Sequence, residues 1–213
     1  MRKICELKNI NKSYGKHKVL NNISITVYGG EMVAITGKSG SGKTTLLNIL
    51  GLLEKPEDGS VLLFDEKSPR IGSLQANKIL REKLSYLFQN FALIDNATID
   101  NNLEIPLLYS KKTKREKREL KLSALKKVGL NVSLNQKIHE LSGGEQQRVA
   151  IARILLRPCE LVLADEPTGS LDTENRDDIL RILKELNNEG KTIIIVTHDK
   201  CVSEACHRTV ELI

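Results

Sequence analysis

Two segments of this 213-residue chain combine glycine and serine in patterns that suit phosphate binding. The first, GKSGSGKT, runs from Gly37 to Thr44. Glycines let a backbone curl closely around oxygens, so that several N–H groups point toward one anion. The second, LSGGEQQR from Leu141 to Arg148, places two glycines before a predicted helix, whose N-terminus attracts anions. Two such sites in so short a chain suggest one nucleotide clamped between two copies of the protein.

The first segment matches the P-loop pattern, which carries meaning only between a strand and a helix. Apolar residues 32–36 predict that strand, and residues 43–52 predict the helix. In such a loop the Lys43 amine reaches the β- and γ-phosphates, and the Thr44 hydroxyl ligates Mg²⁺. The predicted phosphate-binding residues are Gly37, Lys38, Ser39, Gly40, Ser41, Gly42, Lys43, Thr44 and Thr45.

A nucleotide–Mg²⁺ site also needs a carboxylate from a neighbouring strand. Residues 161–164 are apolar, and Asp165 and Glu166 follow at the strand's C-terminal end, where α/β sheets bind ligands. Asp165 is predicted to hold Mg²⁺. Glu166 points the opposite way if the chain stays extended, which suits a general base that polarises water for attack on the γ-phosphorus. Residues 77–80, NKIL, lack the acid of the guanine-binding motif Asn-Lys-x-Asp, so adenine is favoured.

Strands and helices alternate along the chain. Residues 4–10 and 19–28 predict an antiparallel pair with a turn around Gly15. Strands predicted at 60–64, 84–88, 161–164 and 192–197 alternate with helices at 142–156 and 173–188, which indicates a mainly parallel sheet covered on both faces. Residues from about 90 to 140 predict an inserted α-helical subdomain interrupted at Pro106. We therefore expect a single α/β domain over residues 1–213: a P-loop NTPase core with N-terminal antiparallel β-strands.

The net charge of +6 is concentrated in one block. Residues 111–127 hold nine basic and two acidic residues, so the rest of the chain is slightly acidic. With only 3% aromatic residues and a single local block, the charge does not indicate a nucleic-acid partner. A solvated helix face explains the block, and contact with anionic lipid or an acidic partner surface remains open.

Nothing in the sequence predicts secretion or a membrane span. There is no apolar run of about 18 residues, and Glu6 comes before a signal-peptide core could form. The four cysteines show no CxxC pairing, which is typical of reduced thiols. We expect a cytoplasmic protein.

The P-loop, the LSGGEQQR segment and the Asp165–Glu166 pair resemble, in order and spacing, those of the ATPase subunits of ATP-binding-cassette (ABC) transporters. The resemblance covers essentially the whole chain. It implies a homodimer that forms on ATP binding, with each ATP between the P-loop of one chain and Ser142, Gly143 and Gly144 of the other. It also implies ATP hydrolysis with ATP and Mg²⁺ bound.

The same resemblance implies roles for four further residues. Tyr14 would stack on adenine. Gln89 would touch Mg²⁺ and the attacking water and sense a membrane partner. Asp172, in Ser170–Asp172, would cross the dimer interface and could also cap the following helix. His198 would contact the γ-phosphate.

Three short segments, residues 51–54 (GLLE), 88–91 (FQNF) and 105–107 (IPL), resemble one group within the family. These cassettes work with permeases that release lipoproteins or export macrolides or bacteriocin-type peptides. The resemblance implies an integral-membrane permease partner and a peripheral position on the inner face of the cell membrane. An ATPase that regulates a membrane complex in cell-wall or division signalling, without transport, would use the same motifs and remains an alternative. A chromosome ATPase of this fold would need a long coiled coil, and no sustained heptad run is present.

Overall fold

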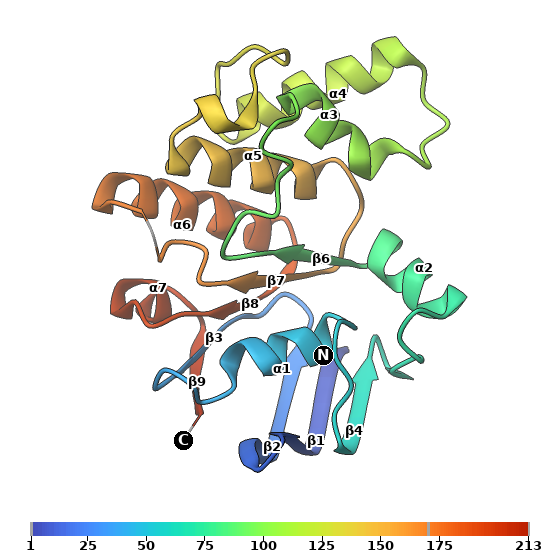
Figure 1. Ribbon diagram of the computed structural model, residues 1–213, viewed down its shortest axis with the longest axis vertical. Coiled ribbons are helices and arrows are strands. Elements are labelled where there is room, and N and C mark those ends of the chain that lie inside the picture. Colours follow the sequence, from blue (N-terminus) through green and yellow to red (C-terminus); the bar gives the residue numbers. More distant parts are fainter. Residues whose placement is uncertain (1, 170, 213) are drawn as a thin grey trace.

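The computed structural model describes residues 2–169 and 171–212 and contains two sheets that differ in strand direction (Figure 1). The antiparallel sheet has the order β2-β1-β4-β5. Its strands are β1 (Lys3–Tyr14), β2 (His17–Tyr28), β4 (Asp58–Leu63) and β5 (Glu66–Lys67). Gly15, with φ +61°, lies in the turn between β1 and β2, so the antiparallel pair predicted around that glycine is confirmed.

The second sheet is parallel throughout, with the order β6-β7-β8-β3-β9. Its strands are β3 (Met32–Gly37), β6 (Leu84–Leu87), β7 (Leu161–Asp165), β8 (Thr192–Val196) and β9 (Arg208–Leu212). Because parallel strands all end at one edge, the residues after β3, β6, β7 and β8 lie at a common edge of the sheet. The predicted α/β class with a mainly parallel sheet is confirmed.

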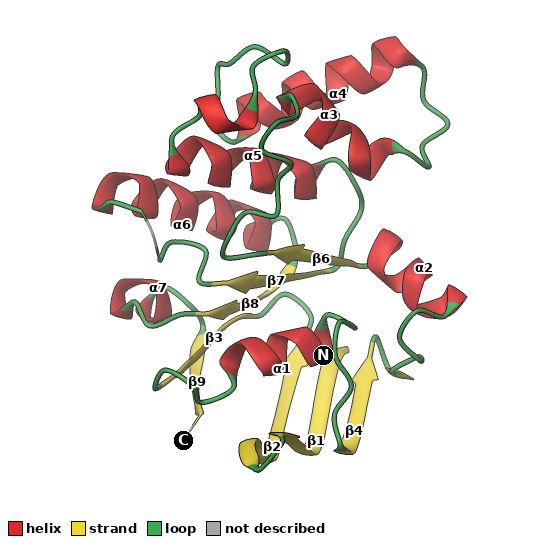
Figure 2. Ribbon diagram, viewed as in Figure 1, coloured by secondary structure: helices red, strands yellow, loops and turns green. Residues whose placement is uncertain are grey.

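Helices cover this sheet and fill the long connection between β6 and β7 (Figure 2). They are α1 (Lys43–Leu50), α2 (Leu74–Glu82), α3 (Ile99–Glu104), α4 (Lys114–Lys127), α5 (Gly143–Leu155), α6 (Thr173–Asn188) and α7 (Lys200–Glu204), with 3₁₀ turns η1 (Ile105–Leu107) and η2 (Ile138–Glu140). Among the described residues no helix has the length and apolar character needed to cross a bilayer.

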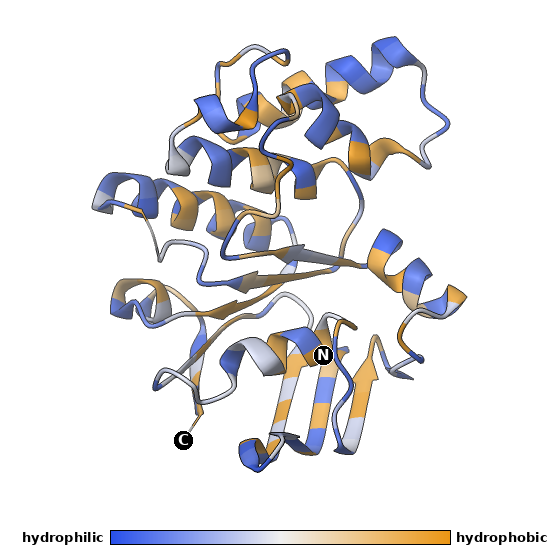
Figure 3. Cartoon of the chain, in the orientation of Figure 1, coloured by the Kyte–Doolittle hydropathy of each residue, from blue (hydrophilic) through white to orange (hydrophobic). Residues whose placement is uncertain are grey.

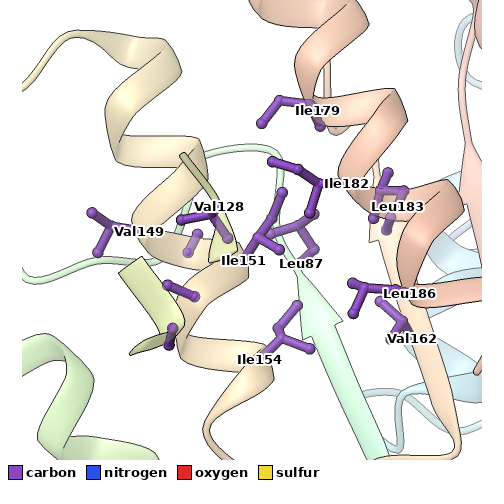
Figure 4. Packing of buried hydrophobic residues seen from close by; sticks show 14 of the residues in the cluster. Leu87, Val128, Val149, Ile151, Ile154, Val162, Ile179, Ile182, Leu183 and Leu186 are labelled. Carbon is purple, nitrogen blue, oxygen red and sulfur yellow. The ribbon is translucent and has the colours of Figure 1, made fainter. Parts of the chain in front are cut away.

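Alternation along the buried strands builds two cores, one on each face of the parallel sheet. In β8, Ile193 and Ile195 pack into the core beneath α5 and α6, while Ile194 and Val196 pack toward α1 and the antiparallel sheet. Figure 4 shows the first core, where side chains of α5 and α6 meet those of β6 and β7. Strands that are buried on both faces have nearly continuous apolar sequence. This is why residues 161–164 and 192–196 predict strands from the sequence alone.

The segment expected to be helical from about residue 90 to 140 contains α3, η1, α4 and η2, and loops separate most of them. Thr113 caps α4 with a reciprocal hydrogen-bond pair to Glu116. The basic residues of α4 give it a mostly hydrophilic surface (Figure 3). One of them, Lys121, is nevertheless buried, because its amine bonds Asp100 at 2.9 Å and Glu104 at 2.7 Å on α3. Helix α2 was not predicted, since it buries only Ala76 and Ile79.

Candidate nucleotide site

The loop between β3 and α1 is shaped by glycines at points where a side chain would collide with the fold. A Cβ on Gly37, at φ +146°, would come within 2.5 Å of the Leu212 carbonyl oxygen. A Cβ on Gly42, at φ +86°, would lie 2.9 Å from the Val19 carbonyl oxygen. The buried Ser41 hydroxyl has no hydrogen-bond partner among the described residues. The loop thus holds a curled backbone and an available polar group, as a phosphate cradle requires.

Lys43 begins α1 and turns its side chain back over this loop. Its amine donates to the carbonyl oxygens of Gly37 and Lys38, both at 2.9 Å. The helix N-terminus adds partial positive charge at the same place. A lysine held over the loop by two carbonyls is positioned to reach an anion bound there.

Thr44 and Asp165 meet where α1 approaches the end of β7. The Thr44 hydroxyl donates to Asp165 Oδ1 at 3.3 Å, and Asp165 is only 5% exposed. Burial raises the pKa of this carboxyl above its ordinary value, and the Thr44 hydrogen bond and nearby Lys43 partly oppose that shift. A hydroxyl beside a carboxylate is the oxygen donor set that Mg²⁺ prefers, so these residues fit the predicted metal.

Glu166 does not continue the strand as the sequence suggested. Its φ is +44°, in the left-handed region that non-glycine residues rarely adopt, while its N–H donates to the Val196 carbonyl at 2.9 Å. The expected extended geometry is therefore wrong, because β7 ends at Asp165 and the chain turns sharply. The turn brings the Glu166 carboxylate to 2.9 Å from Nδ1 of His198, which follows β8.

One cleft of about 500 Å³ gathers half of the predicted site residues. Its lining comprises His17, Val19, Ser39, Gly40, Gly42, Lys43, Thr44, Thr45, Gln89, Glu166, Val196 and His198. Gln89, which follows β6, is 77 residues from Glu166 and 109 residues from His198 in the sequence. It joins them in the cleft because the parallel strands β6, β7 and β8 end side by side. We call this feature the nucleotide cleft.

Sequence reasoning missed three members of the cleft: Val196, His17 and Val19. Val196 ends β8, whereas His17 and Val19 lie at the start of β2, where the hairpin pairs His17 with Tyr14. The sequence feature that could have predicted the two β2 residues is the turn around Gly15, because after this turn β2 runs back past the P-loop and brings Val19 against Gly42.

Tyr14 lies outside the residues that line the nucleotide cleft. Its hydroxyl donates to Glu54 at 2.5 Å, and the Lys12 amine lies 5.4 Å from the centre of its ring. The ring is half exposed at the end of β1. Adenine stacking on Tyr14 therefore stays a prediction.

The residues Ser142, Gly143 and Gly144 and the side chain of Asp172 are also outside the nucleotide cleft. Ser142 caps α5: its hydroxyl accepts the Glu145 N–H at 3.3 Å, and the Glu145 carboxylate accepts the Ser142 N–H at 2.8 Å. Asp172 caps α6, as its sequence position suggested. Ser170 of the same segment lies outside the described residues.

Comparison with known proteins identifies the family. The family model described as ABC transporter matches residues 20–169, which is more than half of the chain. The chain belongs to the ABC transporter family. Because cassettes of this family hydrolyse ATP, it is an ABC transporter ATPase, and the recognition based on its motifs is confirmed.

Relatives of this cassette occur both alone and joined to a permease. It is 46% identical to the uncharacterized ABC transporter ATP-binding protein YvrO of Bacillus subtilis, over 96% of this chain and 91% of the relative. It is 41% identical to the macrolide export ATP-binding/permease protein MacB 2 of Yersinia pestis, over 98% of this chain and 31% of the relative. The cassette thus spans about a third of the length of the MacB proteins it matches.

Solved structures of similar cassettes share the fold. The dimeric cassette MJ0796, in a post-hydrolysis state bound to ADP and Pi, superposes with a TM-score of 0.90. It is 40% identical, over 98% of this chain and 94% of that one. The cassette cbiO1 of Clostridium perfringens, part of the complex cbiONQ, matches with a TM-score of 0.87 at 29% identity, over all of this chain and 85% of that one.

Proposed function

We propose that this cassette powers an exporter of the MacB type, whose cargo is a peptide or bacteriocin, a macrolide or a lipoprotein. The observation that carries the proposal is the division of the site. The P-loop, Gln89, Glu166 and His198 line one cleft, while Ser142 and Gly143 of the LSGGEQQR segment are exposed and do not line it. Such a half-site is useful only to a second copy, so two chains would enclose two ATP molecules head to tail. The dimeric state of MJ0796 supports this arrangement.

Within each site the cleft residues would divide the chemistry of ATP hydrolysis. Lys43 and the N–H groups of the P-loop would hold the β- and γ-phosphates. Glu166 would accept a proton from water as it attacks the γ-phosphorus, and His198, 2.9 Å from Glu166, would orient that carboxylate and contact the γ-phosphate.

Mg²⁺ would be held by Thr44, Asp165 and Gln89, and it would neutralise charge on the phosphate oxygens. The Ser41 hydroxyl, buried without a partner among the described residues, is a further donor toward the phosphates. After cleavage the bridge between the chains is weakened, and the dimer opens.

A groove of about 380 Å³ between the end of α1 and α5 suits a membrane partner. Its apolar walls include Leu53, Leu80, Phe88, Ile105 and Pro106. Two arginines complete it, Arg153 of α5 and Arg157, which follows that helix. Arg153 donates to the Ala92 and Phe91 carbonyls, and Arg157 to the Leu84 carbonyl and the Ser85 hydroxyl. Neither guanidinium has a carboxylate partner among the described residues.

Partly buried cations without a counter-ion favour an anionic occupant, because burial disfavours a lone charge. Burial lowers the pKa of both arginines below the ordinary value. We therefore expect a cytoplasmic segment of the permease, apolar with one carboxylate, to dock in this groove beside Gln89. The MacB relatives, which carry ATP-binding and permease parts in one chain, support a permease partner.

The experiment combines the cassette with the membrane protein encoded beside it, reconstituted in lipid nanodiscs. Arg157→Glu should abolish the stimulation of ATPase activity by the permease while leaving ATP binding intact. Lys184→Glu on the exposed face of α6 makes the same charge change as a control. A six-span importer permease, or a membrane complex that couples ATP hydrolysis to no transport, would contradict the exporter assignment.

A further inference from the structure

The LSGGEQQR segment and Asp172 are joined within one chain by a polar network centred on Asn175 of α6. The Asn175 N–H donates to Asp172 Oδ1 at 2.9 Å, and its side-chain amide donates to Asp172 Oδ2 at 2.8 Å. Its Oδ1 accepts a hydrogen bond from Arg148 of α5 at 2.6 Å. The side-chain amide of Asn175 thus donates a hydrogen bond to Asp172 and accepts one from Arg148, the last residue of the LSGGEQQR segment.

Asn175 also lies against the glycine pair at the start of α5. A Cβ on Gly144 would come within 2.3 Å of Asn175 Oδ1 and 2.6 Å of its Cγ. The φ of Gly144 is not positive, so the backbone itself would accept a side chain there. Position 144 therefore favours glycine because the Asn175 side chain occupies the space that a Cβ would need. The two residues pack directly against each other.

Two further contacts fix the surroundings of this amide. Arg148 also binds Asp178 of α6 at 2.6 Å. The fully buried Gln147 donates to the Pro167 carbonyl at 2.6 Å, in the loop that leads from Glu166 toward Asp172. Hydrogen bonds to charged groups are the stronger class, and here they connect the helix N-terminus of α5 to the start of α6.

We propose that Asn175 is a positioning residue that holds the Ser142–Gly144 half-site and Asp172 as one rigid unit, so that both reach the partner's ATP together. This inference rests on the head-to-tail dimer proposed above. The hydrogen bonds of Asn175 go to Asp172 and Arg148, so its role is to position these groups rather than to act on the reacting atoms. Its loss should leave nucleotide binding by a single chain unchanged and weaken the ATP-driven encounter of two chains.

The test uses the Glu166→Gln chain with ATP and Mg²⁺, in which dimers should accumulate. Adding Asn175→Ala should raise the dimer dissociation constant tenfold or more, because two side-chain hydrogen bonds to charged partners are lost. The affinity of the monomer for a fluorescent ATP analogue should change less than twofold. Asn188→Ala, an exposed asparagine on the same helix, is the matched control and should change neither quantity.

A double-mutant cycle separates positioning from general stability. In an Asp172→Ala background, Asn175→Ala should weaken dimers by less than threefold, because the link between Asn175 and Asp172 is already broken and only the bond from Arg148 is left to lose. Equal effects in both backgrounds, unchanged dimerisation, or a parallel loss of monomer ATP affinity would each overturn the proposal.

Two further controls keep the outcome clear. If Asn175→Ala does not fold, Asn175→Asp replaces it, since that variant keeps the volume and the acceptor for Arg148 but puts a second carboxylate beside Asp172. If the Glu166→Gln parent forms no ATP-dependent dimers at all, the proposed dimer itself fails, and the positioning role fails with it.

Discussion

Replacing Ser142 with alanine should separate nucleotide binding from dimerisation. The hydroxyl of Ser142 accepts the Glu145 N–H at 3.3 Å and donates to the Glu145 carboxylate at 2.8 Å. The bond from the Ser142 N–H to the same carboxylate, also 2.8 Å, survives the substitution. Loss of a helix cap of this kind costs about 1 kcal/mol. For a chain of this size that corresponds to a Tm lower by roughly 2–4 °C, so the variant stays folded.

The functional cost should be much larger than this structural one. Ser142 is outside the nucleotide cleft, so monomer affinity for ATP should change by less than twofold. In the proposed dimer its hydroxyl faces the partner's γ-phosphate, and a hydrogen bond to a charged group contributes about 1.5–3 kcal/mol. With two such contacts per dimer, ATP-driven dimerisation should weaken by roughly a hundredfold or more. Steady-state ATPase activity should fall with it.

The chain supplies its own control for the cap. Thr113 caps α4 with the same reciprocal bonds to Glu116, at 2.7 Å and 3.3 Å. Thr113→Ala should therefore lower the Tm about as much as Ser142→Ala but leave dimerisation and turnover unchanged. The assay is light scattering coupled to size exclusion in the Glu166→Gln background, with a fluorescent ATP analogue for the monomer. If Ser142→Ala weakened monomer ATP affinity as much as Lys43→Ala, the assignment of this segment to the partner's site would be refuted.

Three further outcomes follow from the geometry. Gly42→Ala should abolish ATP binding, measured by equilibrium dialysis. The φ of +86° at Gly42, and the 2.9 Å between a Cβ there and a carbonyl oxygen of β2, leave no room for a methyl group. Normal ATP affinity would contradict the assignment of this loop as the phosphate-binding site. Thr44→Val should raise the Mg²⁺ concentration for half-maximal ATPase activity at least tenfold while the Tm stays near that of the parent chain, and an unchanged Mg²⁺ requirement would remove Thr44 from the metal site. Lys117 and Lys121 hold the pKa of Glu104 below its ordinary value; its stabilising charge is therefore present above about pH 4.3 and lost as pH falls through the lowered pKa. The free energy of unfolding, measured with urea, should consequently change less between pH 5 and pH 3 in Lys121→Met than in the parent chain. An equal change in both chains would show that the ion pair of Lys121 with Glu104 does not cause this pH dependence.

The contiguous motifs were available from the sequence because their chemistry depends on neighbouring residues. A P-loop is defined by the order of glycine, lysine and threonine, and its strand and helix lie immediately beside it. Continuous apolar strands such as residues 161–164 announce burial on both faces and therefore a parallel sheet. The helix cap at Asp172 is local for the same reason.

Arrangements that depend on long-range packing were decided only by the tertiary structure. The left-handed backbone of Glu166 is held by a bond to Val196 on another strand, so no local pattern announces it. The placement of Val19 over the P-loop depends on where β2 crosses α1. The network of Asn175, Arg148 and Asp172 joins two helices whose facing sides are set by the core beneath them. The sequence specifies which chemical groups this ATPase carries, whereas packing decides which of them share a cleft and which are turned outward for a second chain.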